Sequence, residues 1–439
     1  MSGLAPQRSL MNCAPRGFPP GRAVEWASFS DCYLTPLLYM PITPSSKRKA
    51  LRIPAKTVVK TSPRQRKAGG RLRLPGDVLL MVGTVKGAFF FWSDEKRKKW
   101  RMDGPHFAGE SVYAVAFDGR AGRHRAFAST RSFHWGSVLR SSDNFGETWT
   151  APDRQNIRFP EESGLSLVQI WQICPATDAD PNTVYAGVEP SALFVSKDAG
   201  DTWEPVAGLL AHEHRPRWTP GGGGMCLHTI LPSPGKSQRM LVAMSTGGVY
   251  GTDDGGRSWK PRNIGIRAPF LPDKYPEFGQ CVHKVVRHSS RPERLFAQNH
   301  WGLYRSDDCG DNWNDIANGV PSDFGFAMEI HPHDPDTVFI VPLESDGFRC
   351  TPEAKLRVYR TTNAGKNWKP LTKGLPQKDA FETVLRDGLT ADQFSKAGVY
   401  FGTRSGKLFG SANGGDNWQE IADGLPAIVC VKAVTLRQA

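Results

Sequence analysis

Cysteine and histidine stand at the same spacing in two places of this chain, in the fragments Cys226-Leu-His228 and Cys281-Val-His283. Residues two apart on a β-strand point to the same side, so each fragment would present a thiol beside an imidazole. Thiolate and imidazole are common ligands of zinc. Neighbouring strands that bring these four residues together would form a zinc site. The alternative is two pairs of buried side chains that recur because the surrounding sequence repeats, and no cofactor is then required.

Carboxylates form the second group of candidate catalytic residues. Glu189 and Glu344 each follow a short apolar run and precede a turn, and Asp323 and Asp346 lie in comparable segments. Two carboxyl groups at a suitable separation are what hydrolysis of a glycosidic bond needs. We therefore take Glu189 and Glu344 as the candidate catalytic pair.

Histidine, tryptophan, arginine and tyrosine gather in the longer loops. One of these loops, at 205–224, contains AHEHRPRWTPGGGG, whose glycine run lacks the Gly-Lys-Ser/Thr ending of a phosphate-binding loop. Long loops of this composition are usually functional. The candidate ligand-binding residues are His106, His134, Trp135, His212, His214, Arg217, Trp218, Tyr275, His300 and Trp301.

A repeated phrase, here called the box, indicates which elements position these residues. It reads Ser-Lys-Asp-Ala-Gly-Asp-Thr-Trp at 196–203. We predict that Ser196 and Asp198 cap backbone N–H groups of a tight turn, that Gly200 supplies a positive φ, and that Trp203 packs between units. Asn replaces the acidic residue in three copies, which a hydrogen-bonding cap tolerates and a general acid does not. The copies end at Trp100 (a degenerate one), Trp149, Trp203, Trp259, Trp313, Trp368 and Trp418.

The spacing of these tryptophans, between 49 and 56 residues, is typical of a propeller or a solenoid. Between boxes, short β-branched or aromatic runs alternate with Gly and Pro turns, which indicates four antiparallel strands per unit. We predict an all-β, seven-bladed β-propeller of four-stranded blades over residues 76–439. The first unit begins at Asp77 without an innermost strand, and the spare strand at 428–436 would complete it and close the ring.

Strand order in such a propeller predicts where the candidate residues lie. Loops before the innermost strands and turns between second and third strands share one face, opposite the boxes. The candidate ligand-binding and catalytic residues fall in these segments, so we predict a ligand site at the central mouth. The alternative is a set of solvated loop residues.

The boxes resemble Asp-boxes, the bacterial neuraminidase repeats of sialidases, which also occur in sortilin-type receptors and photosystem II assembly factors. The segments VGTVKGAFFF, PRWTPGGGGMCLHTI, GQCVHK and SDFGFAMEIHP are similar to a bacterial family of seven-bladed repeat propellers labelled sialidase-like glycosyl hydrolases. The resemblance implies the fold over 76–439 and an exo-sialidase-like hydrolase. The Arg-Ile-Pro signature of sialidases occurs only at 52–54, outside the strand pattern, and we interpret it as a chance match. The box itself is a structural motif that occurs in proteins of many functions, so it assigns no chemistry.

Charge is concentrated at the N-terminus. Residues 1–75 hold 14 Lys and Arg against 2 Asp and Glu, so they carry +12 of the net +13. We interpret this segment as a disordered tail and favour a true start near Leu79, with a transit peptide or a basic tether as alternatives. The remainder is nearly neutral, so we expect no specific nucleic-acid binding by the propeller. The eight cysteines without a CxxC pair, and the absence of a long apolar run, favour a cytoplasmic monomer with no membrane span.

Two functions remain open from the sequence. The first is a propeller that binds, and in the stronger form hydrolyses, a glycan at the mouth. The second is a non-enzymatic platform for a protein partner. A metal-dependent enzyme that uses the His and Cys residues at the mouth is a weaker third.

Overall fold

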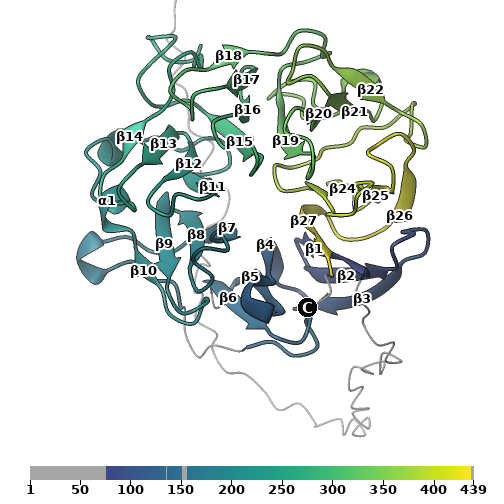
Figure 1. Cartoon of the computed structure of the whole chain (residues 1–439), viewed down its shortest axis with the longest axis horizontal. Helices are drawn as coiled ribbons and strands as arrows, with labels where there is room; N and C mark the ends of the chain where they lie inside the picture. The colour runs from purple at the N-terminus through teal and green to yellow at the C-terminus, as the bar shows by residue number, and fades with distance from the viewer. Residues whose placement is uncertain (1–75, 135, 151–155, 437–439) are drawn as a thin grey trace, which may run out of the picture. The chain divides into compact units, whose positions relative to one another are not determined.

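The structure, a computed structural model, describes residues 76–134, 136–150 and 156–436. Within these ranges, seven antiparallel sheets stand around a central axis (Figure 1). Six sheets have four strands, and the remaining one has three described strands. The prediction of an all-β, seven-bladed propeller is therefore confirmed. The predicted tail at 1–75 lies outside the described residues.

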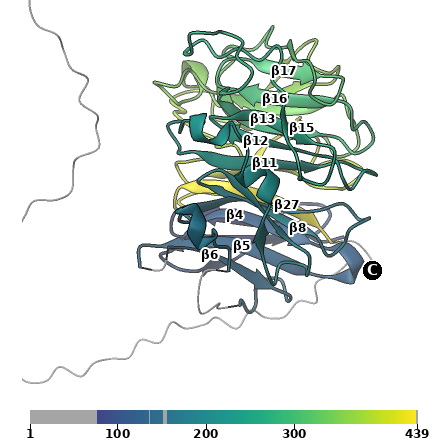
Figure 2. The same cartoon turned by 90° about the vertical axis from the view of Figure 1, so that its left-hand side faces the viewer.

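The sheets are numbered here as blades 1 to 7 in chain order, with strands given from the axis outward. Blade 1 contains β27 (Ile428–Thr435), β1 (Val78–Thr84), β2 (Gly87–Ser93) and β3 (Arg101–His106); blade 2 contains β4 (Ser111–Asp118), β5 (Arg125–Ser132) and β6 (Gly136–Ser142). Blade 3 contains β7 (Gln169–Pro175), β8 (Val184–Glu189), β9 (Ala192–Ser196) and β10 (Glu204–Pro205); blade 4 contains β11 (Cys226–Pro232), β12 (Met240–Ser245), β13 (Gly248–Thr252) and β14 (Lys260–Pro261). Figure 2 turns the ring on its side, with strands of blades 2 to 5 following one another from bottom to top.

The last three blades continue the same order. Blade 5 contains β15 (Val282–Arg287), β16 (Leu295–Asn299), β17 (Leu303–Ser306) and β18 (Asn314–Asp315). Blade 6 contains β19 (Gly325–Ile330), β20 (Val338–Pro342), β21 (Val358–Thr361) and β22 (Lys369–Leu371), and blade 7 contains β23 (Leu389–Ala391), β24 (Val399–Gly402), β25 (Leu408–Ser411) and β26 (Gln419–Ala422). The described α-helix is the short α1 (Ala207–Leu210), and no described helix is long and apolar enough to cross a membrane.

The C-terminal strand closes the ring. β27 pairs antiparallel with β1 along its whole length, from Val78 opposite Thr435 to Thr84 opposite Ile428. All seven residues of β1 are buried. Closure by the last strand, predicted from the missing innermost strand of the first unit, is confirmed.

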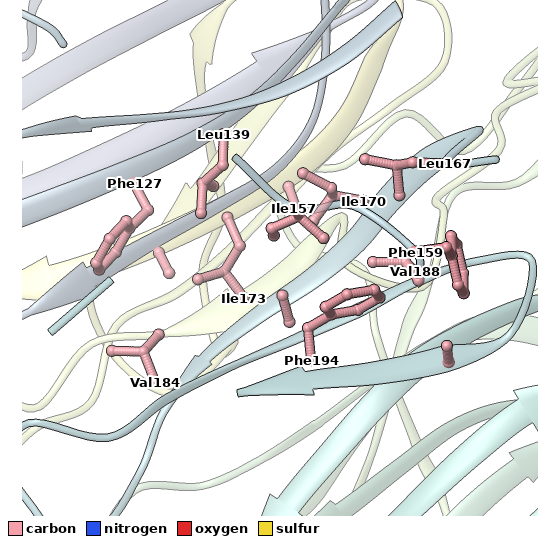
Figure 3. Close-up of a cluster of buried hydrophobic side chains, with 14 residues drawn as sticks. Phe127, Leu139, Ile157, Phe159, Leu167, Ile170, Ile173, Val184, Val188 and Phe194 are labelled. Carbon is pink, nitrogen blue, oxygen red and sulfur yellow. The ribbon is translucent and has the colours of Figure 1, made fainter. Parts of the chain in front are cut away.

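The hydrophobic core lies between neighbouring blades. Second and third strands are buried on both faces because another sheet packs against each side, as β8 and β9 show. Figure 3 shows one such cluster, in which Phe127 and Leu139 of blade 2 meet Ile170 and Phe194 of blade 3. Innermost strands face the axis with one side, so β4 alternates between half-buried and buried positions.

Six of the seven boxes close their turns with their own side chains, as blade 3 illustrates. Ser196 Oγ donates to Asp198 Oδ1 over 2.7 Å and accepts the Gly200 N–H over 2.7 Å. Asp198 Oδ1 also accepts the Thr202 N–H over 2.8 Å. Gly200 has a φ of 101°. Trp203 Nε1 donates to the Gly200 carbonyl over 3.0 Å, and its ring packs on the cluster of blades 2 and 3.

Replacement of the box glycine should destabilise the fold through two separate effects, a steric clash of the new side chain and strain in the backbone. Gly200→Ala would place a Cβ 2.6 Å from Phe127 Cε1 at a φ that L-residues rarely adopt. We expect a loss of about 2–4 kcal/mol in the free energy of unfolding, measured by urea denaturation. Gly235→Ala is the matched control, because Gly235 has a φ of 68° with no atom within 4 Å of the added Cβ. An equal loss in both variants would show that the contact with Phe127 contributes nothing.

The degenerate box of blade 1 joins blade 1 to blade 7. Arg97 occupies the position of the box glycine with a φ of 53°. Its Nη1 donates to the buried Asp392 Oδ2 over 2.9 Å. Tyr400 donates its hydroxyl to the same oxygen over 2.7 Å, and the Gly398 N–H donates to Oδ1 over 2.8 Å. Arg97, the residue that departs from the box pattern, therefore forms an ion pair between blades 1 and 7.

Candidate functional site

The predicted mouth face is a continuous set of loops. Turns between second and third strands hydrogen-bond to the loops that precede innermost strands. The Thr246 N–H donates to the Thr219 carbonyl over 3.1 Å, and the His300 N–H to the Cys281 carbonyl over 2.9 Å. The boxes lie at the other end of the same strands. We call the face formed by these loops and turns the mouth face.

A cavity of about 390 Å³ occupies the centre of the ring below the mouth face. Innermost strands of several blades line it, and charged side chains interrupt their apolar runs. Lys284 pairs with Asp387, whereas burial raises the pKa of Glu329, against the opposing charges of Lys432 and Lys284. These residues were not predicted. A charge inside an innermost strand, as in VHKVVR at 282–287, is the sequence signal that could have identified them.

Glu189 lies next to Trp171, which lines this cavity, and is held by its neighbours. Trp171 Nε1 donates to Glu189 Oε2 over 2.9 Å. A Cβ added at Gly224 would overlap the Glu189 carboxylate and would sit at a φ of 95°, which L-residues rarely adopt, so glycine lets the loop pass close to this side chain. The Arg386 guanidinium carbon lies 5.0 Å from the centre of the Trp171 ring. The mouth therefore combines a carboxylate, an indole and a guanidinium.

Glu344, the second candidate catalytic residue, lies in the turn after β20 with an exposed side chain. Glu189 belongs to blade 3 and Glu344 to blade 6, and no hydrogen bond or ion pair among the described residues joins them. The structure therefore places both on the mouth face, on blades that are not neighbours in the ring.

Several candidate ligand-binding residues are exposed or half-buried on the mouth face. Trp301 stacks on Phe270 with ring centres 5.1 Å apart, and Tyr275 is 62% exposed. Arg217 and His134 are exposed as well. His300 is half-buried beside Trp301. Trp135 lies outside the described residues.

Four other candidates are engaged in packing. His106 packs against Phe90 with its ring tilted, and burial lowers the pKa of His106, although the charge of Asp103 opposes this. The other three form one cluster around a buried tyrosine. His214 Nδ1 and Trp218 Nε1 each lie 3.0 Å from the Tyr250 hydroxyl, and both side chains are buried. Burial also lowers the pKa of His214. His212 uses Nε2 toward the Trp259 carbonyl and Nδ1 toward the His214 N–H.

The two Cys-x-His fragments differ in their surroundings. His228 uses both ring nitrogens, because Nε2 lies 2.9 Å from the Val282 carbonyl and Nδ1 lies 3.0 Å from Thr229 Oγ1. The group that the structure brings together is instead Cys281, His283 and His300. Burial raises the pKa of Cys226 to about 11 and holds those of His228 and His283 well below the ordinary value. The six described cysteines are all free.

Large apolar side chains are exposed mainly on the mouth face. Phe133, at the turn after β5, is 99% exposed. The aromatic residues exposed in mouth-face loops are Phe133, Phe270, Tyr275, Phe348 and Phe381. Exposed aromatic residues gathered on one face mark a surface that binds something.

Comparison with known proteins gives a partial similarity. No family model matches the chain. The oligoxyloglucan-reducing end-specific xyloglucanase of Emericella nidulans is 27% identical over 220 residues, which cover 43% of this chain and 25% of the enzyme. The match thus spans a quarter of the length of this curated relative.

Solved structures of two kinds are similar in fold. An ancestral GH74 enzyme is 18% identical, with a TM-score of 0.48 over 71% of this chain and 38% of its own. YCF48 from Cyanidioschyzon merolae is 15% identical, with a TM-score of 0.48 over 72% of this chain and 87% of its own. YCF48 bound to D1 peptide is 13% identical, with a TM-score of 0.45 over 80% of this chain and 86% of its own.

Proposed function

We propose that this protein is a glycan-binding propeller that takes up an oligosaccharide at the central mouth. The observation that carries the proposal is the set of aromatic side chains exposed on the mouth face, in a ring whose centre holds a cavity with charged side chains. Aromatic rings offer flat apolar surface to the C–H face of a sugar ring, while carboxylate and guanidinium groups hydrogen-bond its hydroxyls. Trp301 with Phe270 would be the stacking platform, and Glu189 with Arg386 the polar part.

Hydrolysis is the stronger form of the proposal and depends on Glu189. One oxygen of this carboxylate accepts a hydrogen bond from Trp171, whose side chain lines the cavity. It would act on a glycosidic bond together with a second carboxylate of the mouth face, for which Glu344 is the candidate. The partial similarity to a xyloglucanase makes xyloglucan oligosaccharides the first probe.

Binding of xyloglucan oligosaccharides should depend on the aromatic platform. Trp301→Ala is expected to weaken binding about 10- to 30-fold in isothermal titration calorimetry, because truncation of an aromatic anchor costs about 2 kcal/mol. Ile264→Ala is the matched control, since Ile264 is 70% exposed but contributes no ring. Absence of heat with a panel of neutral and acidic oligosaccharides would refute glycan binding. Release of reducing sugar that Glu189→Gln abolishes would establish hydrolysis.

A platform for a protein partner is the second candidate function. The nearly complete exposure of Phe133 favours it, because a single protruding ring suits a pocket on another protein. Arg349 and Arg386, which both lie near the Phe326 ring, add residues that protein interfaces enrich. In this case oligosaccharides should give no heat, and Phe133→Ala should abolish recovery of a defined partner.

A further inference from the structure

Three side chains of types that commonly bind metal ions converge beside the mouth. None of them belongs to the stacking platform or to the polar part of the proposed glycan site. Cys281 and His283 stand at the start of β15, and His300 follows β16. Their ligand atoms all lie within 4.8 Å of one another. Cys281 Sγ and His283 Nε2 are 3.6 Å apart. Two ligands of one tetrahedral zinc ion, with Zn–S of about 2.3 Å and Zn–N of about 2.0 Å, would be about 3.5 Å apart.

The second nitrogen of each imidazole is fixed by an acceptor. His283 Nδ1 lies 2.6 Å from the Gly325 carbonyl, and His300 Nε2 lies 3.2 Å from Asp346 Oδ2. A carbonyl and a carboxylate only accept, so each neutral imidazole keeps its proton there and its lone pair on the other nitrogen. Metal-ligating histidines almost always show this arrangement, with a carboxylate or carbonyl behind the ring.

The equivalent fragment of blade 4 shows that repetition alone does not produce this arrangement. His228 follows Cys226 at the same spacing, but its ring nitrogens lie against the Val282 carbonyl and Thr229 Oγ1. In His283, by contrast, Nε2 faces the Cys281 thiol. In blade 5, the backbone bond from the His300 N–H to the Cys281 carbonyl brings the third side chain to the pair.

We propose that Cys281, His283 and His300 bind one divalent cation of the zinc class. Asp346 and the Gly325 carbonyl orient the two imidazoles, and the fourth position is left to water or an anionic oxygen. The Arg386 guanidinium donates to the His283 carbonyl over 3.2 Å. Its charge opposes a bare dication, whereas the Cys281 thiolate and the Asp346 carboxylate offset it. The same charge favours an anion as the fourth ligand. The proposal of a cation site does not rest on the proposed glycan binding, although Arg386 adjoins both sites.

Cobalt substitution of the full-length protein tests the proposal. After treatment with a chelator, titration with Co²⁺ should saturate at one ion per chain. Two absorption features are expected: the visible bands of tetrahedral cobalt and a near-ultraviolet charge-transfer band from the thiolate. Zn²⁺ should displace both. Absence of the charge-transfer band at saturating Co²⁺ would overturn the assignment.

Variants identify the ligands. Cys281→Ser should remove the charge-transfer band, and Asp346→Asn should weaken cobalt binding about 10- to 100-fold while the band persists. Asp346 is 58% exposed, so its replacement leaves the core intact. Cys226→Ser is the matched control and should keep both the band and the affinity. Retention of the band in Cys281→Ser, or its loss in Cys226→Ser, would refute the three-residue ligand set.

Discussion

Deletion of residues 428–439 is expected to leave the protein largely unfolded. The deletion removes β27, which pairs with every residue of β1. It also removes Ile428, Val431 and Ala433 from a core cluster that they share with Leu80 and Val82. Burial of each larger side chain contributes about 1.5–3 kcal/mol, and the exposed ladder of β1 adds to the loss. Their sum is comparable to the whole stability of a domain, about 5–15 kcal/mol.

Circular dichroism and size-exclusion chromatography would measure this effect. We expect loss of the cooperative thermal transition together with an increase in hydrodynamic radius or aggregation. Deletion of 437–439 alone is the control, because β27 then remains. A truncated protein that still melted cooperatively near the temperature of the full chain would show that β27 is not required to hold the ring.

Restoration of the consensus glycine in the degenerate box is expected to destabilise the protein. Arg97→Gly relieves a positive φ, worth about 1 kcal/mol. It also leaves the buried carboxylate of Asp392 without its cation, and removal of one partner of a buried pair costs about 3–5 kcal/mol. We therefore expect a net loss of about 2–4 kcal/mol in the free energy of unfolding, measured by urea denaturation.

Lys98→Gly, at the exposed neighbouring position of the same box, serves as the control for chain flexibility. A double-mutant cycle of Arg97→Gly with Asp392→Asn would isolate the coupling of the two side chains. An increase in stability of Arg97→Gly would contradict the role that we assign to this ion pair.

The fold was predictable because the repeat itself encodes it. The box spacing indicated the blade, and the missing strand at Asp77 indicated the role of 428–436. The contact of Arg97 with Asp392 was not predictable, because it joins residues 295 positions apart. At the scale of one turn, the sequence pattern identified Gly200 but not the positive φ of the preceding Ala199, since alanine carries no signal of that conformation.

The sequence was sufficient to predict which face of the propeller carries the candidate residues, but not which contacts their side chains make. Strand order placed Glu189, Tyr275 and Trp301 on the mouth face, as the structure has them. It could not show that His214 and Trp218 turn inward, because the buried hydroxyl of Tyr250 that holds them belongs to another strand. Nor could it show that His300 joins Cys281 and His283, because that contact depends on the conformation of one turn.

The pairing of β1 with β27 also sets an order for synthesis on the ribosome. Val78–Thr84 leaves the exit tunnel long before Ile428–Thr435, and at about 5–20 residues per second the interval is roughly 20 to 70 s. Throughout this interval, the edge of β1 that pairs with β27 in the folded protein lacks that strand. A nascent polypeptide that stalls in blade 7 would therefore expose the unpaired edge of the apolar strand β1 to chaperones and proteases. Slow translation of the codons for β27 would favour degradation of this intermediate.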